Sequence, residues 1–129
     1  MQVEINNTAD NNQVVKDAKA WDVYAMANVQ APTGDPEYWF TVFATSNATK
    51  NQGKYRSARL DVLENQLSRE FDPAKRAQLA LDMQQVVLDD HAFVFCSFLK
   101  MSMISKANVK NYTSHACDYY QVTADLDVE

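Results

Sequence analysis

Two of the three prolines in this 129-residue chain directly follow an aspartate, at positions 35–36 and 72–73. An aspartate before a helix accepts hydrogen bonds from free backbone N–H groups, and a proline at the first helical position removes no donor that the helix needs. Each pair therefore predicts the start of a helix. The residues after the first pair form one apolar face at spacings of three and four: Tyr38, Trp39, Val42 and Phe43.

The second pair opens the longest predicted helix, which runs from Asp72 to about Asp90. A shorter helix precedes it, because Ser57 can cap a stretch in which leucines recur on one helix face. The two stretches predict amphipathic helices. Their apolar residues are Leu60, Leu63 and Leu67 in the shorter helix, and Leu79, Met83, Val86 and Val87 in the longer one.

Short apolar stretches outside these helices predict strands. Gln2–Ile5 and Trp21–Ala27 flank a predicted helix at Gln13–Ala20. Strand, helix and strand in this order are typical of a right-handed crossover between parallel strands. Two more strands are expected after the longest helix, a buried one at Phe93–Cys96 and another at Met101–Ser105.

The tail adds one more expected strand around Tyr119–Ala124. The pattern gives no internal repeat and no domain boundary. The predicted fold class is therefore α/β: a single domain over residues 1–129, with a small mixed sheet and three to four helices.

The charge balance excludes two kinds of partner. The net charge is −5, and lysines and arginines form no basic stripe, so the chain offers no surface for nucleic acid or an anionic membrane. The opening Met1–Ile5 lacks the basic and apolar regions of a signal peptide. We interpret it as a strand that begins abruptly, as though cut from a longer chain.

The few residues suited to catalysis or metal binding do not form a convincing site. His91 at a helix end is expected to meet free backbone carbonyls, and Cys96 in an apolar strand is expected to be a buried small hydrophobe. His115, Cys117 and Asp118 offer metal ligands in a short polar loop, but a closed zinc site needs four. Cys96 and Cys117 permit one disulfide without requiring it. We predict no enzyme, no cofactor and no metal site.

Four segments, in order, carry a resemblance that covers nearly the whole chain. They are Val3–Ile5 with Trp21–Met26, Asn51–Ser57 with Leu60–Leu63, Asp72–Arg76 with Leu88–Asp90, and Lys106–Tyr112. These segments resemble the last quarter of family 5 extracellular solute-binding proteins, the peptide/nickel class that feeds ABC importers.

The resemblance implies a two-lobed, periplasmic-binding-protein-like fold that closes on a solute by hinge motion without making or breaking a bond. This chain would be a C-terminal fragment that carries much of the second lobe. The implied partners are a small solute, either a peptide or a metal chelate, and an ABC permease reached through the full-length protein. The implied location is the periplasm or the cell surface, where a lipid can anchor the parent protein.

The resemblance also singles out the loop after the second predicted strand, which in the family faces the cleft between the lobes. Its candidate ligand-binding residues are Asn28, Val29, Gln30, Pro32 and Thr33. The loop follows the carboxyl end of a predicted strand, where α/β sheets collect ligands, and its amide and hydroxyl groups both donate and accept hydrogen bonds.

The solute class stays open between peptide and nickel. Peptide-binding members often place an aspartate at the position of Pro32, whereas the pair 31–32 resembles nickel-type members. Those members carry an aromatic residue at the position of Val29 and a histidine near Ala48. A plain surface turn is the alternative interpretation of the loop.

The alternative function is an autonomous protein-interaction domain. It would bind a protein partner through exposed aromatic residues such as Tyr38, Trp39, Tyr119 or Tyr120. A stable homodimer, or an exposed apolar patch of more than a few hundred Å², would favour this alternative.

Overall fold

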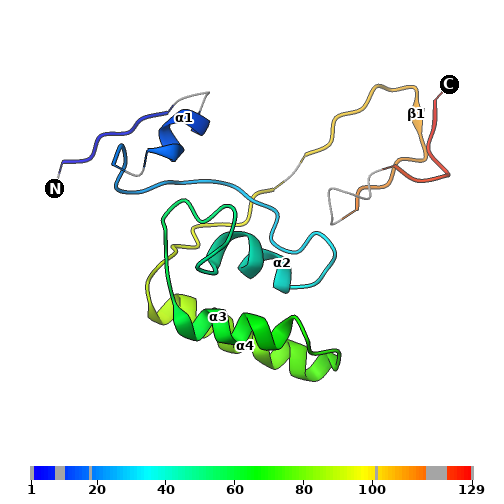
Figure 1. The fold of residues 1–129 in the computed structure, drawn as a ribbon. Coiled ribbons are helices and arrows are strands. Elements are labelled where there is room, and N and C mark those ends of the chain that lie inside the picture. The colour runs from blue at the N-terminus through cyan, green and yellow to red at the C-terminus, as the bar shows by residue number, and fades with distance from the viewer. Residues whose placement is uncertain (1, 8–10, 18, 101, 116–121, 129) are drawn as a thin grey trace.

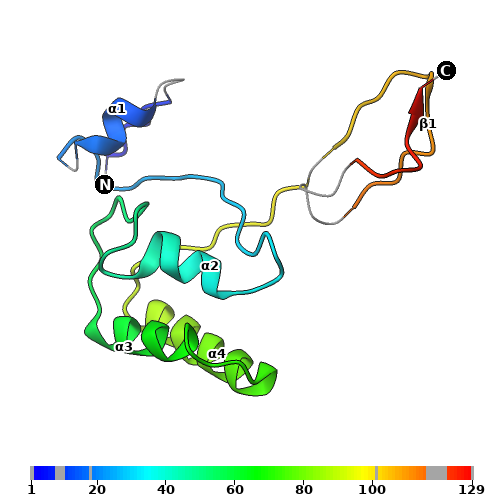
Figure 2. The same ribbon diagram turned by 45° about the vertical axis from the view of Figure 1, so that its right-hand side comes forward.

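The computed structural model describes residues 2–7, 11–17, 19–100, 102–115 and 122–128. In Figure 1, a layer of helices occupies the middle of the molecule, with α1 on one side and a small two-stranded sheet on the other; Figure 2 shows the same separation. The elements in chain order are α1 (Asn11–Lys16), α2 (Glu37–Trp39), η1 (Phe40–Ala44), α3 (Ala58–Leu67), α4 (Pro73–Asp89), β1 (Val109–Lys110) and β2 (Asp127–Val128). None of the described helices is both long and apolar enough to span a bilayer.

The predicted helix starts at Ser57 and Asp72 are confirmed. Asp72 Oδ1 accepts hydrogen bonds from the backbone N–H groups of Ala74 and Lys75, both at 3.0 Å. Ser57 Oγ accepts one from the N–H of Leu60 at 3.4 Å. These side chains satisfy donors that have no partner inside a first helical turn. The local sequence therefore determines where α3 and α4 begin.

The first aspartate–proline pair also precedes a helix, as predicted. Asp35 Oδ1 accepts a hydrogen bond from the N–H of Glu37 at 2.9 Å. After one α-helical turn the backbone widens into the π-helix η1, in which the N–H of Thr45 donates to the carbonyl of Phe40 at 3.0 Å. Phe40, the first residue of η1, is 2% exposed and is absent from the predicted apolar face.

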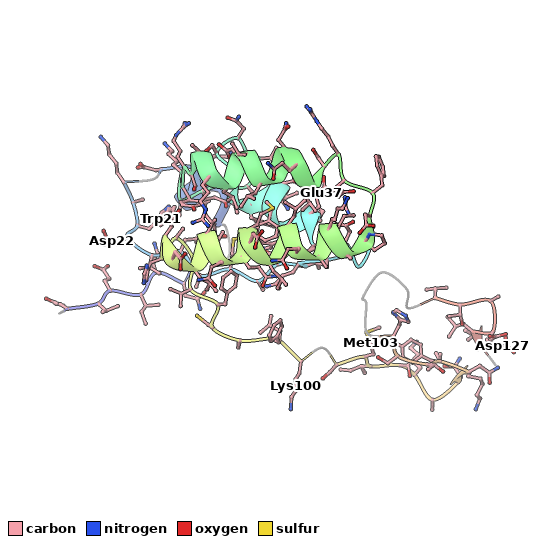
Figure 3. All side chains as sticks on the ribbon, turned by 90° about the horizontal axis from the view of Figure 1, so that it is seen from below. Trp21, Asp22, Glu37, Lys100, Met103 and Asp127 are labelled. Atoms are coloured by element: carbon pink, nitrogen blue, oxygen red, sulfur yellow. The ribbon has the colours of Figure 1, made fainter. Side chains whose placement is uncertain are left out.

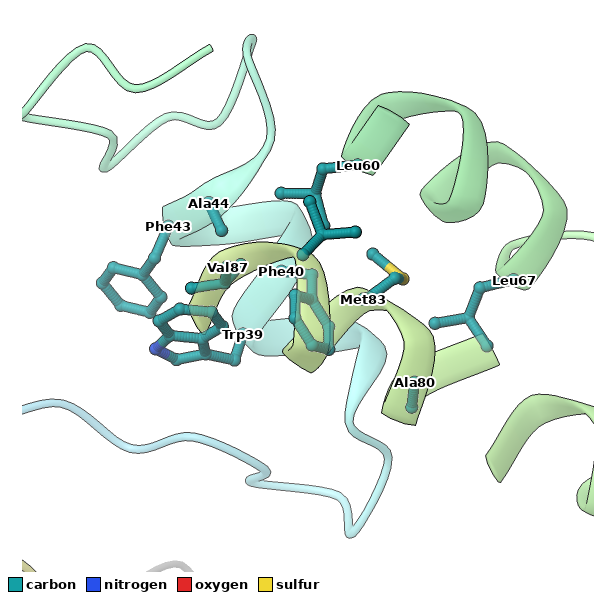
Figure 4. Packing of buried hydrophobic residues seen from close by; sticks show 10 residues of the cluster. Trp39, Phe40, Phe43, Ala44, Leu60, Leu67, Ala80, Met83 and Val87 are labelled. Atoms are coloured by element: carbon teal, nitrogen blue, oxygen red, sulfur yellow. The ribbon is translucent and has the colours of Figure 1, made fainter. Parts of the chain in front are cut away.

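The core lies between α2, η1, α3 and α4 (Figure 4). The predicted leucine stripe of α3 and the apolar face of α4 are confirmed, although Leu63 and Leu79 are only half-buried. Trp39 is buried, so it is not the exposed aromatic that the interaction-domain alternative requires. The ten buried core residues are Trp39, Phe40, Phe43, Ala44, Leu60, Leu67, Ala80, Met83, Val86 and Val87.

A side-chain network fixes the loop between η1 and α3. Asn51 Nδ2 donates to the carbonyls of Thr45 at 3.1 Å and Tyr55 at 2.7 Å, and Asn51 Oδ1 accepts from the N–H of Tyr55 at 2.9 Å. One amide thus satisfies three backbone groups in a stretch without regular structure. This gives a physical role to the first residue of the segment Asn51–Ser57 that carries the family resemblance.

The expected mixed sheet is not present among the described residues. They contain one antiparallel pair, β1 with β2, in which Val109 lies opposite Val128 and Lys110 opposite Asp127. The stretches at 2–5, 21–27, 93–96 and 102–105 are not strands. A strand needs a neighbour to satisfy its backbone groups, and these segments find none in the described chain. The strand expected around Tyr119–Ala124 lies partly outside the described residues, and its described end, 122–124, is not a strand.

Two more local predictions were wrong. The first helix is Asn11–Lys16 in place of Gln13–Ala20. The segment Phe93–Cys96 is largely exposed, with Val94 at 86%, and Cys96 is an exposed free thiol in place of a buried hydrophobe. Cys117 lies outside the described residues.

Tyr55 is expected to make this fold less stable at alkaline pH. Burial, and then the hydrogen bond that its hydroxyl donates to Asp90, raise the pKa of Tyr55. A raised pKa in the folded state gives stability that is complete below the unfolded pKa of about 10 and is lost as the pH rises through the folded pKa. We expect the free energy of unfolding to fall above about pH 10, and to fall less steeply in Tyr55→Phe. Urea unfolding followed by circular dichroism between about pH 8 and pH 11 measures both slopes; equal slopes would contradict the role of Tyr55.

Candidate functional site

The five candidate residues lie together in one surface loop between an extended segment and α2. Asn28, Gln30 and Thr33 are exposed, whereas Val29 and Pro32 are half-buried. The loop therefore presents its amide and hydroxyl groups to solvent and partly buries Val29 and Pro32. It offers hydrogen-bond donors and acceptors to a polar molecule, and no titratable group.

A tight turn shapes the end of this loop. The N–H of Gly34 donates to the carbonyl of Ala31 at 3.0 Å, with Pro32 at the second position of the turn, where its fixed φ is favourable. Gly34 has φ +82°, a conformation that residues with a Cβ rarely adopt. The proline and glycine that marked this stretch as a loop thus have defined conformational roles.

Arg76 of α4 holds the residues that follow the loop. Its Nη2 lies 2.6 Å from Asp35 Oδ2 and 2.8 Å from Glu37 Oε2. Its Nη1 donates to the carbonyls of Leu67 and Glu70, each at 2.8 Å. The hydrogen bond to Glu37, followed by that to Asp35, raises the pKa of the guanidinium. One side chain therefore joins the end of the loop to both α3 and α4.

The sequence does not identify Arg76 as an anchor. There it is only the last residue of the segment Asp72–Arg76 that carries the family resemblance, and its partner Asp35 lies 41 positions earlier in the chain. The local signal, an arginine in the first turn of a helix, does not indicate which distant carboxylate it meets. A partly buried arginine beside two acids becomes visible only in three dimensions.

Replacing Arg76 with glutamine is expected to lower the melting temperature and to loosen residues 34–37. The change removes two ion pairs and the hydrogen bonds that Arg76 donates to the carbonyls of Leu67 and Glu70. Lys75→Gln is the matched control, because Lys75 is exposed and lies 4.0 Å from its partner Glu70. Thermal melts and amide hydrogen exchange at 34–37 compare the variants. Equal melting temperatures and equal exchange rates in Arg76→Gln and Lys75→Gln would contradict the anchoring role of Arg76.

The surface hollows of the helix layer lie away from this loop. One, of about 610 Å³, lies between α3 and α4 and is lined by residues such as Gln66, Arg69 and Gln78. Another, of about 350 Å³, is lined by Thr41, Thr45, Asn47, Asp61 and Glu64. Neither of these two hollows includes a residue of 28–34.

Those residues considered for catalysis or metal binding that the structure describes, His91, Cys96 and His115, are not assembled into a centre. His91 Nδ1 lies 2.7 Å from the carbonyl of Asp89, as expected for a histidine at a helix end, and the Cys96 thiol points to the carbonyl of Val94 at 3.8 Å. Of the cluster His115–Asp118, residues 116–118 lie outside the described part of the chain. Within the described residues, no three His, Cys, Asp or Glu side chains form a group that could hold a metal ion.

Comparison with known proteins finds a sequence relative of this chain. The chain is 25% identical over 112 residues to the nickel-binding protein NikA of Staphylococcus aureus. The aligned stretch covers 87% of this chain and 23% of NikA. No protein-family model matches the chain. The chain thus spans about a quarter of the length of the relative that it matches.

A solved structure extends this match to nearly every residue. The crystal structure of Staphylococcus aureus NikA in complex with Ni(L-His)2 superimposes with a TM-score of 0.78 and 22% identity, over 98% of this chain and 27% of NikA. The fold of the chain is therefore that of a portion of NikA. Sequence and structure together confirm the predicted resemblance: the chain is homologous to part of NikA, a family 5 solute-binding protein.

Proposed function

We propose that this chain forms part of an extracytoplasmic solute-binding protein of the peptide/nickel class, which captures a small solute for an ABC importer and catalyses no reaction. The observation that carries the proposal is the fold match over 98% of the chain to a protein crystallised with a bound nickel–histidine complex. In this role the chain belongs to the second of two lobes. Its permease partner would be reached through the assembled protein, in the periplasm or at the cell surface.

The loop at 28–34 is proposed as one side of the ligand cleft. Asn28, Gln30 and Thr33 are exposed, and the turn at Gly34 and the Arg76 anchor support the end of the loop. Rigid support lets polar groups bind a ligand without a large cost of ordering. The rest of the cleft would come from a part of the protein that this chain does not include, since the chain spans only 27% of the NikA structure.

A metal chelate fits the chemistry of this loop better than a bare metal ion. The loop has no histidine, cysteine or carboxylate, which are the usual metal ligands. A chelate brings its ligands with it, so the protein needs only hydrogen bonds to the chelator's polar groups. The same groups suit a peptide backbone, and the two solute classes are separated by direct binding measurements.

The test replaces the matched portion of Staphylococcus aureus NikA with this chain and measures binding of nickel–histidine and of a panel of oligopeptides by calorimetry. Asn28→Ala, Gln30→Ala and Thr33→Ala are each expected to weaken binding roughly twofold to tenfold, the effect of losing one hydrogen bond. Gln84→Ala, an exposed amide on α4, is the matched control. Unchanged binding in all three loop variants would remove the loop from the ligand site.

A thermal melt of the chain alone completes this test. With only part of the cleft present, we expect no shift with nickel–histidine or peptides. A ligand at a hundred times its Kd adds about 2.7 kcal/mol, which is about 10 °C for a chain of this size. A shift of that size would show that the chain holds a complete site and would contradict the two-sided cleft.

A further inference from the structure

The two hollows of the helix layer differ in the charge of their walls. The larger one has two basic side chains, Arg69 and Lys75, beside its acids. Among the described residues, the smaller one, of about 350 Å³, is lined by two carboxylates and by no basic side chain. We call it the acidic hollow. Its five lining residues, each with an oxygen atom in its side chain, are Thr41, Thr45, Asn47, Asp61 and Glu64.

Both carboxylates of the acidic hollow reach from α3 to η1, which packs against α3 and α4 as part of the helical run that begins at Glu37 (Figure 3). Asp61 and Glu64 are three positions apart and so share one face of α3. Asp61 Oδ1 accepts a hydrogen bond from the N–H of Ser46 at 2.9 Å. Glu64 Oε1 accepts one from the hydroxyl of Thr41 at 3.4 Å. Each bond uses one oxygen of its carboxylate.

The negative charge of the two carboxylates is not offset by a neighbouring side chain. Neither Asp61 nor Glu64 forms an ion pair within the part of the chain that the structure describes. Both side chains are half-buried, so water screens their repulsion less than it would on an open surface. A cation between them would stabilise both.

A buried hydroxyl on the η1 side of the hollow gives independent support for a ligand. Thr45, which directly follows η1, lines the hollow and is 8% exposed. Its hydroxyl forms no hydrogen bond with any described residue. A buried polar group without a protein partner often marks a bound water or ion. Oxygen atoms from η1 and from α3 therefore converge on the same space.

Oxygen ligands of this kind select a hard cation. Calcium takes about six to eight oxygens from carboxylates, amide carbonyls and water, in a flexible geometry. Magnesium demands a near-ideal octahedron, and transition metals prefer histidine or cysteine, which the hollow lacks. Its volume also leaves room for the waters that complete a calcium shell.

We propose that the acidic hollow binds one calcium ion, which links η1 to α3. The site has two acids, and its other ligands are neutral oxygens and water. Because few charged ligands give weak calcium binding, we expect a Kd of about 10⁻⁴–10⁻³ M, as in extracellular modules. The sequence, from which we predicted no metal site, does not show this arrangement, since Ser46 and Asp61 are 15 positions apart.

Titration of the full chain with calcium chloride, after removal of divalent ions on a chelating resin, measures this affinity by calorimetry. Sodium chloride at about 0.1 M screens diffuse attraction to the net charge of −5. We expect one saturable site, with magnesium chloride binding at least about tenfold more weakly. We also expect about 10 mM calcium to raise the melting temperature by roughly 5–10 °C. No saturable calcium binding, or equal affinity for magnesium, would overturn the proposal.

Two glutamate variants provide the matched comparison. Glu64→Gln removes one charge but keeps an oxygen that can accept from Thr41, and is expected to lower calcium affinity at least about tenfold. Glu70→Gln is the control, because Glu70 is also half-buried but lies in the other hollow, 4.0 Å from Lys75. Its calcium affinity is expected to stay unchanged. Equal calcium affinities in the two variants would exclude the acidic hollow as the site.

A gain of affinity tests the same site without relying on a loss. Asn47→Asp adds a third carboxylate to the acidic hollow and is expected to raise calcium affinity about tenfold. A variant that had merely lost its fold could not bind more tightly. Unchanged or weaker calcium binding in Asn47→Asp would place the ion elsewhere and overturn the proposal.

Discussion

Replacing Trp39 with alanine is expected to lower the free energy of unfolding by about 3–5 kcal/mol, the usual cost of removing a large buried aromatic side chain. Trp39 is 8% exposed and lies within ring-contact distance of Phe40, Phe43, Phe93 and Phe95. The change leaves a cavity in the core. It also removes the ring contacts of Trp39 with Phe93 and Phe95, which follow α4.

Urea unfolding followed by far-ultraviolet circular dichroism measures this loss. The control is Trp21→Ala, because the other tryptophan is only half-buried and its ring contact is to Tyr24 at 5.7 Å. We expect its effect to be clearly smaller. Equal losses of unfolding free energy in the two variants would mean that the buried Trp39 stabilises the fold no more than the half-buried Trp21 does.

Met83→Ala is expected to lower the free energy of unfolding by about 2–5 kcal/mol. The side chain is fully buried and lies in Figure 4 among the core residues of α2, η1, α3 and α4, near Phe40 and Leu67. The expected loss includes a cavity term as well as lost apolar burial. Met83→Leu keeps the volume and is expected to cost less than about 1.5 kcal/mol.

Leu81→Ala on the same helix is the control, since Leu81 is 56% exposed. The same urea titrations compare the three variants. A cost for Leu81→Ala as large as that for Met83→Ala would show that the outer face of α4 is covered by a partner under the conditions used. In that case the exposed area of the helix layer would need to be measured in the assembled protein.

The helices could be predicted because their signals are local. Asp72 sits beside the N–H groups that it caps, and the leucines of α3 meet the core simply because a helix repeats every 3.6 residues. The π-helical turn could not be predicted, since it depends on how Phe40 packs against the neighbouring helices. The strands failed for a different reason: an apolar run indicates that a segment should be buried, but its pairing partner must be supplied from elsewhere.

In the candidate loop, too, the features that depend on neighbouring residues could be predicted from the sequence. Proline and glycine determined, by their allowed φ values, that residues 31–34 turn. Asn28, Gln30 and Thr33 are exposed in the same loop. The resemblance to solute-binding proteins was also visible in the sequence. Its four segments include the starts of α3 and α4 and Asn51, whose amide fixes the loop before α3 through locally determined hydrogen bonds.

The sequence alone thus determined the starts of α3 and α4, their apolar faces and the turn at 31–34, since each depends on residues close together in the chain. Only the tertiary structure decided that Arg76 meets Asp35 and Glu37, and that the segment after α4 is uncovered. Both are relations between groups far apart in the chain. Their free energy depends on distance and burial, which exist only once the chain has folded.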